Sequence, residues 1–111
     1  MSDREMLECA AKAAGLRFAV EQRPNGESVT LVIDEEKCGN EWNPITNDGD
    51  AFRLIAELEL NVFHVSGNAY AMPSDSDEPE SICSYRDSGG KIQAQRRAIT
   101  LAAARIGGYE G

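Results

Sequence analysis

Apolar residues recur at every third or fourth position in three stretches of the chain, which is the spacing of one face of an α-helix. These stretches are residues 2–15, 47–61 and 91–106, and Asn61 is expected to end the second in the left-handed conformation. We therefore predict three helices. Their apolar faces are Met6, Leu7, Ala10, Ala11 and Ala14 in the first; Ala51, Leu54, Ile55 and Leu58 in the second; and Ile92, Ile99, Ala102, Ala103 and Ile106 in the third.

Polar residues at the helix ends support these assignments. Ser2 and Glu5 form a capping box before the first apolar residues, and Gly15 follows the last ones, where a left-handed residue is needed. Asn47 or Thr46 is expected to cap the second helix. The first helix is rich in alanine, so we expect it to approach its neighbour closely.

Elsewhere the apolar residues alternate with polar ones, as in strands with one buried face. Arg23-Pro24-Asn25-Gly26 and Ser66-Gly67-Asn68 have the composition of hairpin turns. Residues 34–41 and 87–90 read as irregular connections, and 73–80 as an exposed loop. The runs predicted as strands are 16–21, 29–33, 62–65, 69–72 and 81–86.

The predicted order of elements is α-β-β-α-β-β-β-α, which indicates the α+β class. We expect an α/β sandwich in which an antiparallel or mixed sheet of about five strands packs between helices. A chain of 111 residues suits one modest core, so we predict a single domain over residues 1–111.

The formal net charge of the chain is −8, from 11 basic and 19 acidic residues. Such a surface repels phosphate backbones, so no direct nucleic-acid binding is expected, and a basic partner fits better. The acidic residues of the 73–80 loop are the candidates for binding such a partner, although a solvated loop explains them as well. They are Asp75, Asp77, Glu78 and Glu80.

The cysteines indicate a reduced, intracellular protein. Cys9, Cys38 and Cys83 are odd in number and lack paired spacing, which argues against a secreted disulfide framework. Zinc ligation by these cysteines and His64 is disfavoured because structural zinc sites draw on closely spaced ligand pairs. We expect no cofactor, no metal, no signal peptide and no membrane span.

The segment 42–54 contains the only tryptophan and a dense run of helix-starting residues. Asn47-Asp48-Gly49-Asp50 has the composition of a calcium loop but lacks the terminal bidentate Glu, so helix capping is the better interpretation. Asp48 and Asp50 are expected in the first helical turn, where the macrodipole favours anions. Trp42 is interpreted as a core anchor, with an exposed partner-binding anchor as the alternative.

No catalytic motif is evident. His64 is the only histidine, shares a strand face with Val62, and has no partner residues supplied by a recognisable motif. Gly89-Gly90 is not a phosphate loop because no Lys-Ser/Thr pair follows. Arg96-Arg97 could bind an anionic surface, although pairing with nearby acids on an exposed helix flank is the commoner arrangement.

Two segments resemble a known family. Residues 42–51, WNPITNDGDA, and the closing residues 96–107, RRAITLAAARIG, resemble the phage ABA-sandwich domain, a family of small phage and prophage proteins. Residues 7–16 also fit its first helix, and Ile45 and Asn47 replace the commoner Leu and Asp. The resemblance implies a sheet layered between helices and carries no catalytic residue. The motif positions it marks as structural are Trp42, Asn43, Pro44, Asp48, Gly49, Asp50, Arg96 and Arg97.

The leading hypothesis is a non-enzymatic bacteriophage accessory protein in the host bacterial cytoplasm. It would bind a host macromolecule, such as a host protein, for host takeover or against a defence system. The alternatives are an uncharacterised enzyme using Asp48, Asp50 or His64, and a minor virion or assembly component. A monomer is expected, or a homodimer through an alanine-rich helix face.

Overall fold

The computed structural model describes residues 3–22, 24–26, 28–32 and 40–109. Over these residues the chain forms four helices and six strands, so the predicted α+β class is confirmed. In chain order they are α1 (Asp3–Ala13), β1 (Phe18–Gln22), β2 (Ser28–Val32), β3 (Asn40–Glu41), α2 (Asp48–Leu58), β4 (Leu60–Val65), β5 (Asn68–Pro73), β6 (Ser81–Ser84), α3 (Tyr85–Ser88) and α4 (Lys91–Ile106).

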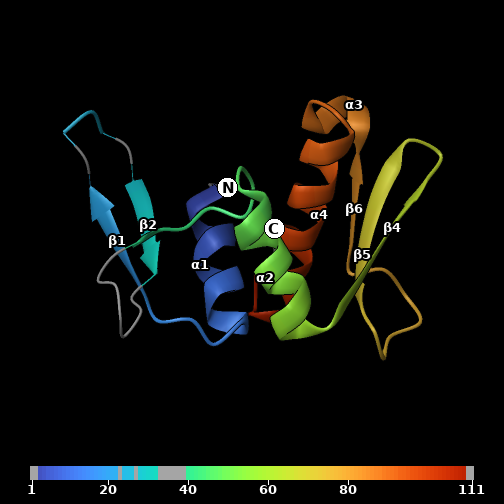
Figure 1. Ribbon diagram of the computed structural model, residues 1–111, viewed down its shortest axis with the longest axis horizontal. Helices are drawn as coiled ribbons and strands as arrows, with labels where there is room; N and C mark the ends of the chain where they lie inside the picture. Colours follow the sequence, from blue (N-terminus) through green and yellow to red (C-terminus); the bar gives the residue numbers. More distant parts are fainter. Residues whose placement is uncertain (1–2, 23, 27, 33–39, 110–111) are drawn as a thin grey trace.

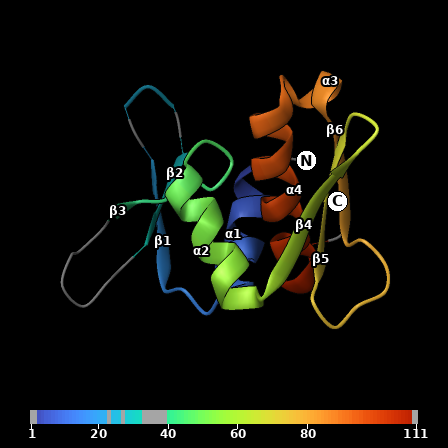
Figure 2. The same cartoon turned by 45° about the vertical axis from the view of Figure 1, so that its right-hand side comes forward.

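The strands belong to two separate antiparallel sheets, β1-β2-β3 and β4-β5-β6, rather than to the single sheet expected from the sequence. Helices α1, α2 and α4 lie between them, with one sheet on each side (Figure 1). A second view, in which β3 is visible beside β2, shows the same separation (Figure 2). The expected layering is therefore inverted, because the helices form the middle layer. Alternation predicts which face of a strand is buried, but not which other strand it pairs with.

Close contact between α1 and α4 creates this middle layer. Ala10 and Ala11 of α1 and the alanines of α4 are fully buried, as expected for the alanine-rich helix. Gly107, just after α4, lies so close to α1 that a Cβ there would run into the carbonyl oxygen of Cys9. Small side chains allow the two backbones to approach, which increases dispersion contacts. Because these alanines are buried, they cannot also form the homodimer face considered above.

The β4-β5-β6 sheet packs one face on α4. Ala69, Ala71 and Cys83 are buried on that face, and the Ser81 hydroxyl donates a hydrogen bond to the backbone carbonyl of Ala98 in α4. The registers Phe63↔Tyr70 and Tyr70↔Ile82 align the residues of the opposite face across the three strands. Within the described chain, no helix or strand of the fold covers that opposite face, which lies on the outside of the molecule (Figure 2).

Several local predictions are confirmed. The last helix has the predicted bounds 91–106, Gly15 has a φ of 72°, and the side chain of Asn47 caps α2. Ser66 and Gly67 both have positive φ at the β4–β5 turn, as a two-residue hairpin turn with matching twist requires.

Other local predictions are wrong. Glu59, not Asn61, is the left-handed residue after α2, and β4 begins at the next residue. The predicted strand 81–86 ends at Ser84, whose side chain caps the short helix α3. This helix includes residues 87 and 88, which were expected to be irregular. Asn40–Glu41, read as irregular, pair with β2.

Two side chains of the third apolar face also differ from expectation. Ile92 and Ile106 are exposed, whereas Ile99, Ala102 and Ala103 are buried. Both exposed residues lie in the terminal turns of α4. The predictions for Ser2, Arg23, Ile33 and Cys38 fall outside the described residues.

Candidate functional site

Hydrogen bonds from backbone N–H groups to side-chain oxygens help to hold the turn that precedes α2. The backbone N–H of Asn43 donates to Asp50 Oδ2 at 2.9 Å, and the N–H of Asp50 donates to Asn47 Oδ1 at 2.9 Å. The N–H of Ile45 donates to Asn43 Oδ1 at 3.0 Å. Asp50 therefore links the start of the turn to the first turn of the helix, and its charge also lies near the positive end of the helix dipole.

The same turn buries its aromatic and proline residues. Trp42 is 3% exposed and Pro44 is among the most deeply buried side chains. Of the two interpretations of Trp42, the core anchor is confirmed, since a side chain this deeply buried offers no surface to a partner. The indole Nε1–H has no hydrogen-bond partner among the described residues. The Trp42–Asp50 segment is thus architectural, and it positions Asp48 and Gly49 at the edge of a groove.

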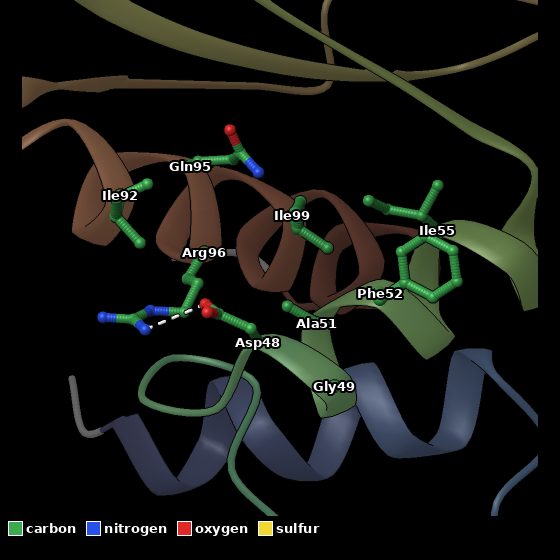
Figure 3. A pocket seen from close by; sticks show the side chains of 9 residues that line it. All are labelled: Asp48, Gly49, Ala51, Phe52, Ile55, Ile92, Gln95, Arg96 and Ile99. Atoms are coloured by element: carbon green, nitrogen blue, oxygen red, sulfur yellow. Dashed lines mark hydrogen bonds and ion pairs between the residues drawn. The ribbon is translucent and has the colours of Figure 1, made fainter.

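This groove lies between α2 and α4 and encloses about 410 Å³ (Figure 3). Its apolar walls come from both helices: the side chain of Phe52 is 69% exposed and that of Ile92 is 52% exposed. Arg96 and Gln95 add polar groups from α4. The lining residues are Asp48, Gly49, Ala51, Phe52, Ile55, Ile92, Gln95, Arg96 and Ile99.

An ion pair closes one end of the groove. Arg96 Nη1 donates to Asp48 Oδ1 at 3.0 Å, joining the first turn of α2 to α4 (Figure 3). The Arg96 side chain is only 18% exposed, whereas that of Asp48 is 77% exposed. The predicted pairing of Arg96 with a nearby acid is confirmed, although its side chain is more buried than an exposed helix flank would be. Arg97 lines a second, polar depression of about 520 Å³ on the other side of Arg96.

His64 lies on the side of β4 that faces α4, with neutral partners. Its Nδ1 is 2.7 Å from the Tyr85 hydroxyl and its Nε2 is 2.9 Å from Gln95 Oε1. Both ring nitrogens therefore lie within hydrogen-bonding distance of a neutral side chain. His64 is thus hydrogen-bonded to neither Asp48 nor Asp50, and these partners give no support to an acid–base role for the three residues.

The outer face of the β4-β5-β6 sheet carries exposed and half-buried apolar side chains together with the polar residues Asn61, Asn68 and Ser84. Phe63 and Tyr70 stack with ring centroids 5.0 Å apart, and Ile82, paired with Tyr70, is 57% exposed. Three of the six large apolar residues exposed in the described chain lie here. We define this outer face as Phe63, Val65, Tyr70, Met72 and Ile82.

The loop between β5 and β6 carries the acidic residues singled out in the sequence. Asp75, Asp77 and Glu78 are exposed and Glu80 is half-buried. Ser76 exchanges two hydrogen bonds with the backbone of Glu78, and Arg105 donates to the carbonyl of Glu80. The loop is therefore ordered by local bonds. Its last acid lies two positions before Ile82, at one end of the apolar outer face.

Cys83 faces α4 and is buried. Burial raises the pKa of its thiol, an effect partly offset by the charges of Arg97 and Arg105. Among residues 3–22, 24–26, 28–32 and 40–109, no three His, Cys, Asp or Glu side chains are placed to share a metal ion. Cys38, one of the ligands considered, lies outside these residues.

Two features, the partners of His64 and the apolar outer face of the sheet, were not predicted from the sequence. The partners of His64 come from α3 and α4, and no spacing connects Tyr85 or Gln95 to a histidine so distant in the chain. The sequence of β4 does contain a signal for the apolar outer face. Phe63 and Val65 alternate with Val62 and His64, so an apolar residue occupies both faces of one strand.

Comparison with known proteins adds no relative: no family model, curated protein or solved structure matches the chain. Within its described part, no helix is long and apolar enough to cross a membrane.

Proposed function

We propose that the chain is a non-enzymatic bacteriophage accessory protein that binds a basic host protein through the outer face of the β4-β5-β6 sheet. The observation that carries this proposal is a cross-strand row in which half-buried Tyr70 lies between exposed Phe63 and exposed Ile82, and Ile82 follows closely after the acidic loop. An apolar centre with a charged rim is the usual anatomy of a protein–protein interface. The bacteriophage context rests on the resemblance of residues 42–51 and 96–107.

The apolar row is not explained by the folding of the core. The same strands already bury Ala69, Ala71 and Cys83 against α4, so the fold does not need apolar residues on the opposite face. Contiguous exposed apolar surface is rare on monomeric proteins and marks interaction sites. Aromatic side chains such as Phe63 and Tyr70 are also the types that concentrate binding energy at interface centres.

Charge selects the partner. The acidic loop, which leads into β6, places Asp75, Asp77 and Glu78 in solvent, on a chain whose net charge is −8. A second copy of the chain would bring the same negative charge to the interface and be repelled, whereas a basic surface would be attracted and steered toward it. We therefore place a basic heterologous partner, rather than a homodimer, on this face.

The test is affinity capture from a bacterial host lysate with matched variants. Ile82→Thr removes apolar surface from the row and keeps a β-branched residue suited to a strand. Ile106→Thr makes the same change at an exposed position at the end of α4. We expect wild type and Ile106→Thr to capture the same protein, and Ile82→Thr to lose it. Equal capture by all three, or by none, contradicts the proposal.

The acidic loop is tested with the partner so identified. The triple change Asp75→Asn, Asp77→Asn and Glu78→Gln removes three charges without altering side-chain size. We expect slower association and a weaker dependence of the rate on salt, because rim charges act mainly on encounter. An association rate that matches wild type at low salt would exclude this role for the loop.

A further inference from the structure

We infer that the groove between α2 and α4 binds a small monocarboxylate with an apolar tail, anchored by Arg96. This site lies on a different surface from the sheet face, so the inference stands or falls separately from the proposed function. It rests on three observations: the shape of the groove, its exposed apolar walls and the unusual state of Arg96.

The size and lining of the groove suit a small molecule. Its volume of about 410 Å³ lies within the roughly 300–1,000 Å³ typical of ligand sites. Phe52 on α2 and Ile92 on α4 project on either side of it and remain largely in water. Ala51 and Ile99 form a buried floor. An apolar tail between the two walls would remove surface from water that the fold itself leaves exposed.

Arg96 supplies the anchor for an anion. Its side chain is mostly buried, and its Nε–H, which solvent does not reach, has no acceptor among the described residues, so a ligand carboxylate would bind the two Nη groups. A buried cationic group gains from a carboxylate partner, and the guanidinium fork can hold one through two parallel hydrogen bonds. Within the described part of the chain, the carboxylate of Asp48 reaches it through a single bond. The guanidinium of Arg96 therefore makes fewer hydrogen bonds to a carboxylate than it can.

A ligand carboxylate can replace Asp48 as the partner of Arg96. The Asp48 side chain is mostly in solvent, and a pair with so exposed a partner contributes little to stability. A carboxylate with a tail bound in the groove would compete with Asp48 for Arg96 and gain the apolar contacts as well. A dianion such as phosphate fits less well, since the rim already carries Asp48 and the neighbouring depression carries Asp87.

A carboxylate with an apolar tail occurs in a free fatty acid and in the C-terminal residue of a peptide. The probes distinguish these two sources. Amide chemical shifts of the labelled protein are followed during addition of octanoate or N-acetyl-leucine. Octanol, which lacks the charge, and acetate, which lacks the tail, serve as controls. We expect octanoate, N-acetyl-leucine or both to shift Gly49, Phe52 and Arg96, with both controls at least about tenfold weaker. The acid that binds more tightly identifies the source.

Variants decide whether Arg96 is the anchor. Arg96→Gln is expected to weaken binding of the preferred acid about tenfold or more, and Arg53→Gln, an exposed change on α2, to leave it unchanged. Asp48→Asn removes the competitor, so we expect binding to tighten roughly two- to fivefold. The spectrum of each free variant checks its fold.

Three results would overturn the inference. They are the absence of shifts at millimolar acid, equal binding of octanol and octanoate, and weaker binding by Asp48→Asn in a variant whose spectrum shows an intact fold. The last result would mean that Asp48 helps to form the site rather than occupying it.

Discussion

The carboxylate of Asp50 accepts the backbone N–H of Asn43 at 2.9 Å and thereby ties the turn after Trp42 to the first turn of α2. The bond joins residues seven positions apart and is partly buried, so removal of the acceptor leaves a donor that water reaches poorly. Asp50 is thus a structural residue of the motif.

Asp50→Ala is expected to lower the free energy of unfolding by about 1.5–3 kcal/mol, because a hydrogen bond to a charged acceptor is lost. Asp77→Ala, in the exposed acidic loop, is the matched control and should change it by less than about 0.5 kcal/mol. Urea unfolding followed by the fluorescence of Trp42 measures both. Equal effects of the two changes would contradict the structural role of Asp50.

Asn47→Ala removes the oxygen that caps Asp50 N–H, and we expect it to cost about 1 kcal/mol of unfolding free energy. Asn47→Ser keeps a capping oxygen and should cost little. The same urea titration distinguishes them. If serine and alanine destabilise equally, the cap does not stabilise α2.

Gly107→Ala tests the close approach of α1 and α4. The φ of Gly107 is −83°, so alanine meets no backbone penalty there, and the main obstacle is the carbonyl of Cys9, with Ala13 Cβ as a second tight contact. We expect a loss of about 1–3 kcal/mol or more from overpacking.

Gly108→Ala is the matched control for that steric effect. Gly108 has a φ of 99° and nothing within 4 Å of an added Cβ, so its cost of about 1–2 kcal/mol would be conformational. Adding Cys9→Ala, which removes the Cys9 side chain and leaves the carbonyl in place, tests whether the clash at Gly107 is with the backbone. Thermal unfolding should show Gly107→Ala destabilised in both backgrounds, and a Gly107→Ala protein as stable as wild type would refute the packing.

The buried thiol of Cys83 predicts a pH dependence. Its pKa is raised in the folded state above the ordinary 9.0, so the folded protein retains this proton at a pH where the unfolded chain loses it. The stabilisation is therefore complete below pH 9 and is lost as pH rises through the folded pKa. Measured against Cys83→Ala, the stability advantage of wild type should shrink in alkaline solution. A constant difference would mean that the pKa is not raised.

The predictability of the fold differed between elements for physical reasons. The helix at 91–106 was found because its apolar period extends over four turns and glycines flank it. Ser84 and Asp87 form the cap of α3, since Ser84 Oγ accepts the Asp87 N–H, but four residues are too few to show a helical period. The division into two sheets was not visible because alternation carries no information on pairing partners.

The candidate sites were only partly visible in the sequence. Asp48, Gly49 and Arg96 were singled out as motif residues, and the structure brings them to one groove. Phe52 is exposed on α2, outside the apolar face predicted for that helix, but a groove requires the position of α4 as well. Spacing within one segment cannot supply that tertiary relation, and the same holds for His64 and its partners.

Backbone hydrogen exchange of the chain, alone and with the captured host protein, tests directly whether the partner binds the outer face of the β4-β5-β6 sheet. Binding there predicts slower exchange in the edge strands β4 (Leu60–Val65) and β6 (Ser81–Ser84) and in the acidic loop 74–80, with α1 unchanged. Protection confined to α1, or to α2 and α4, with the sheet and the loop unaffected, would contradict binding on the outer face.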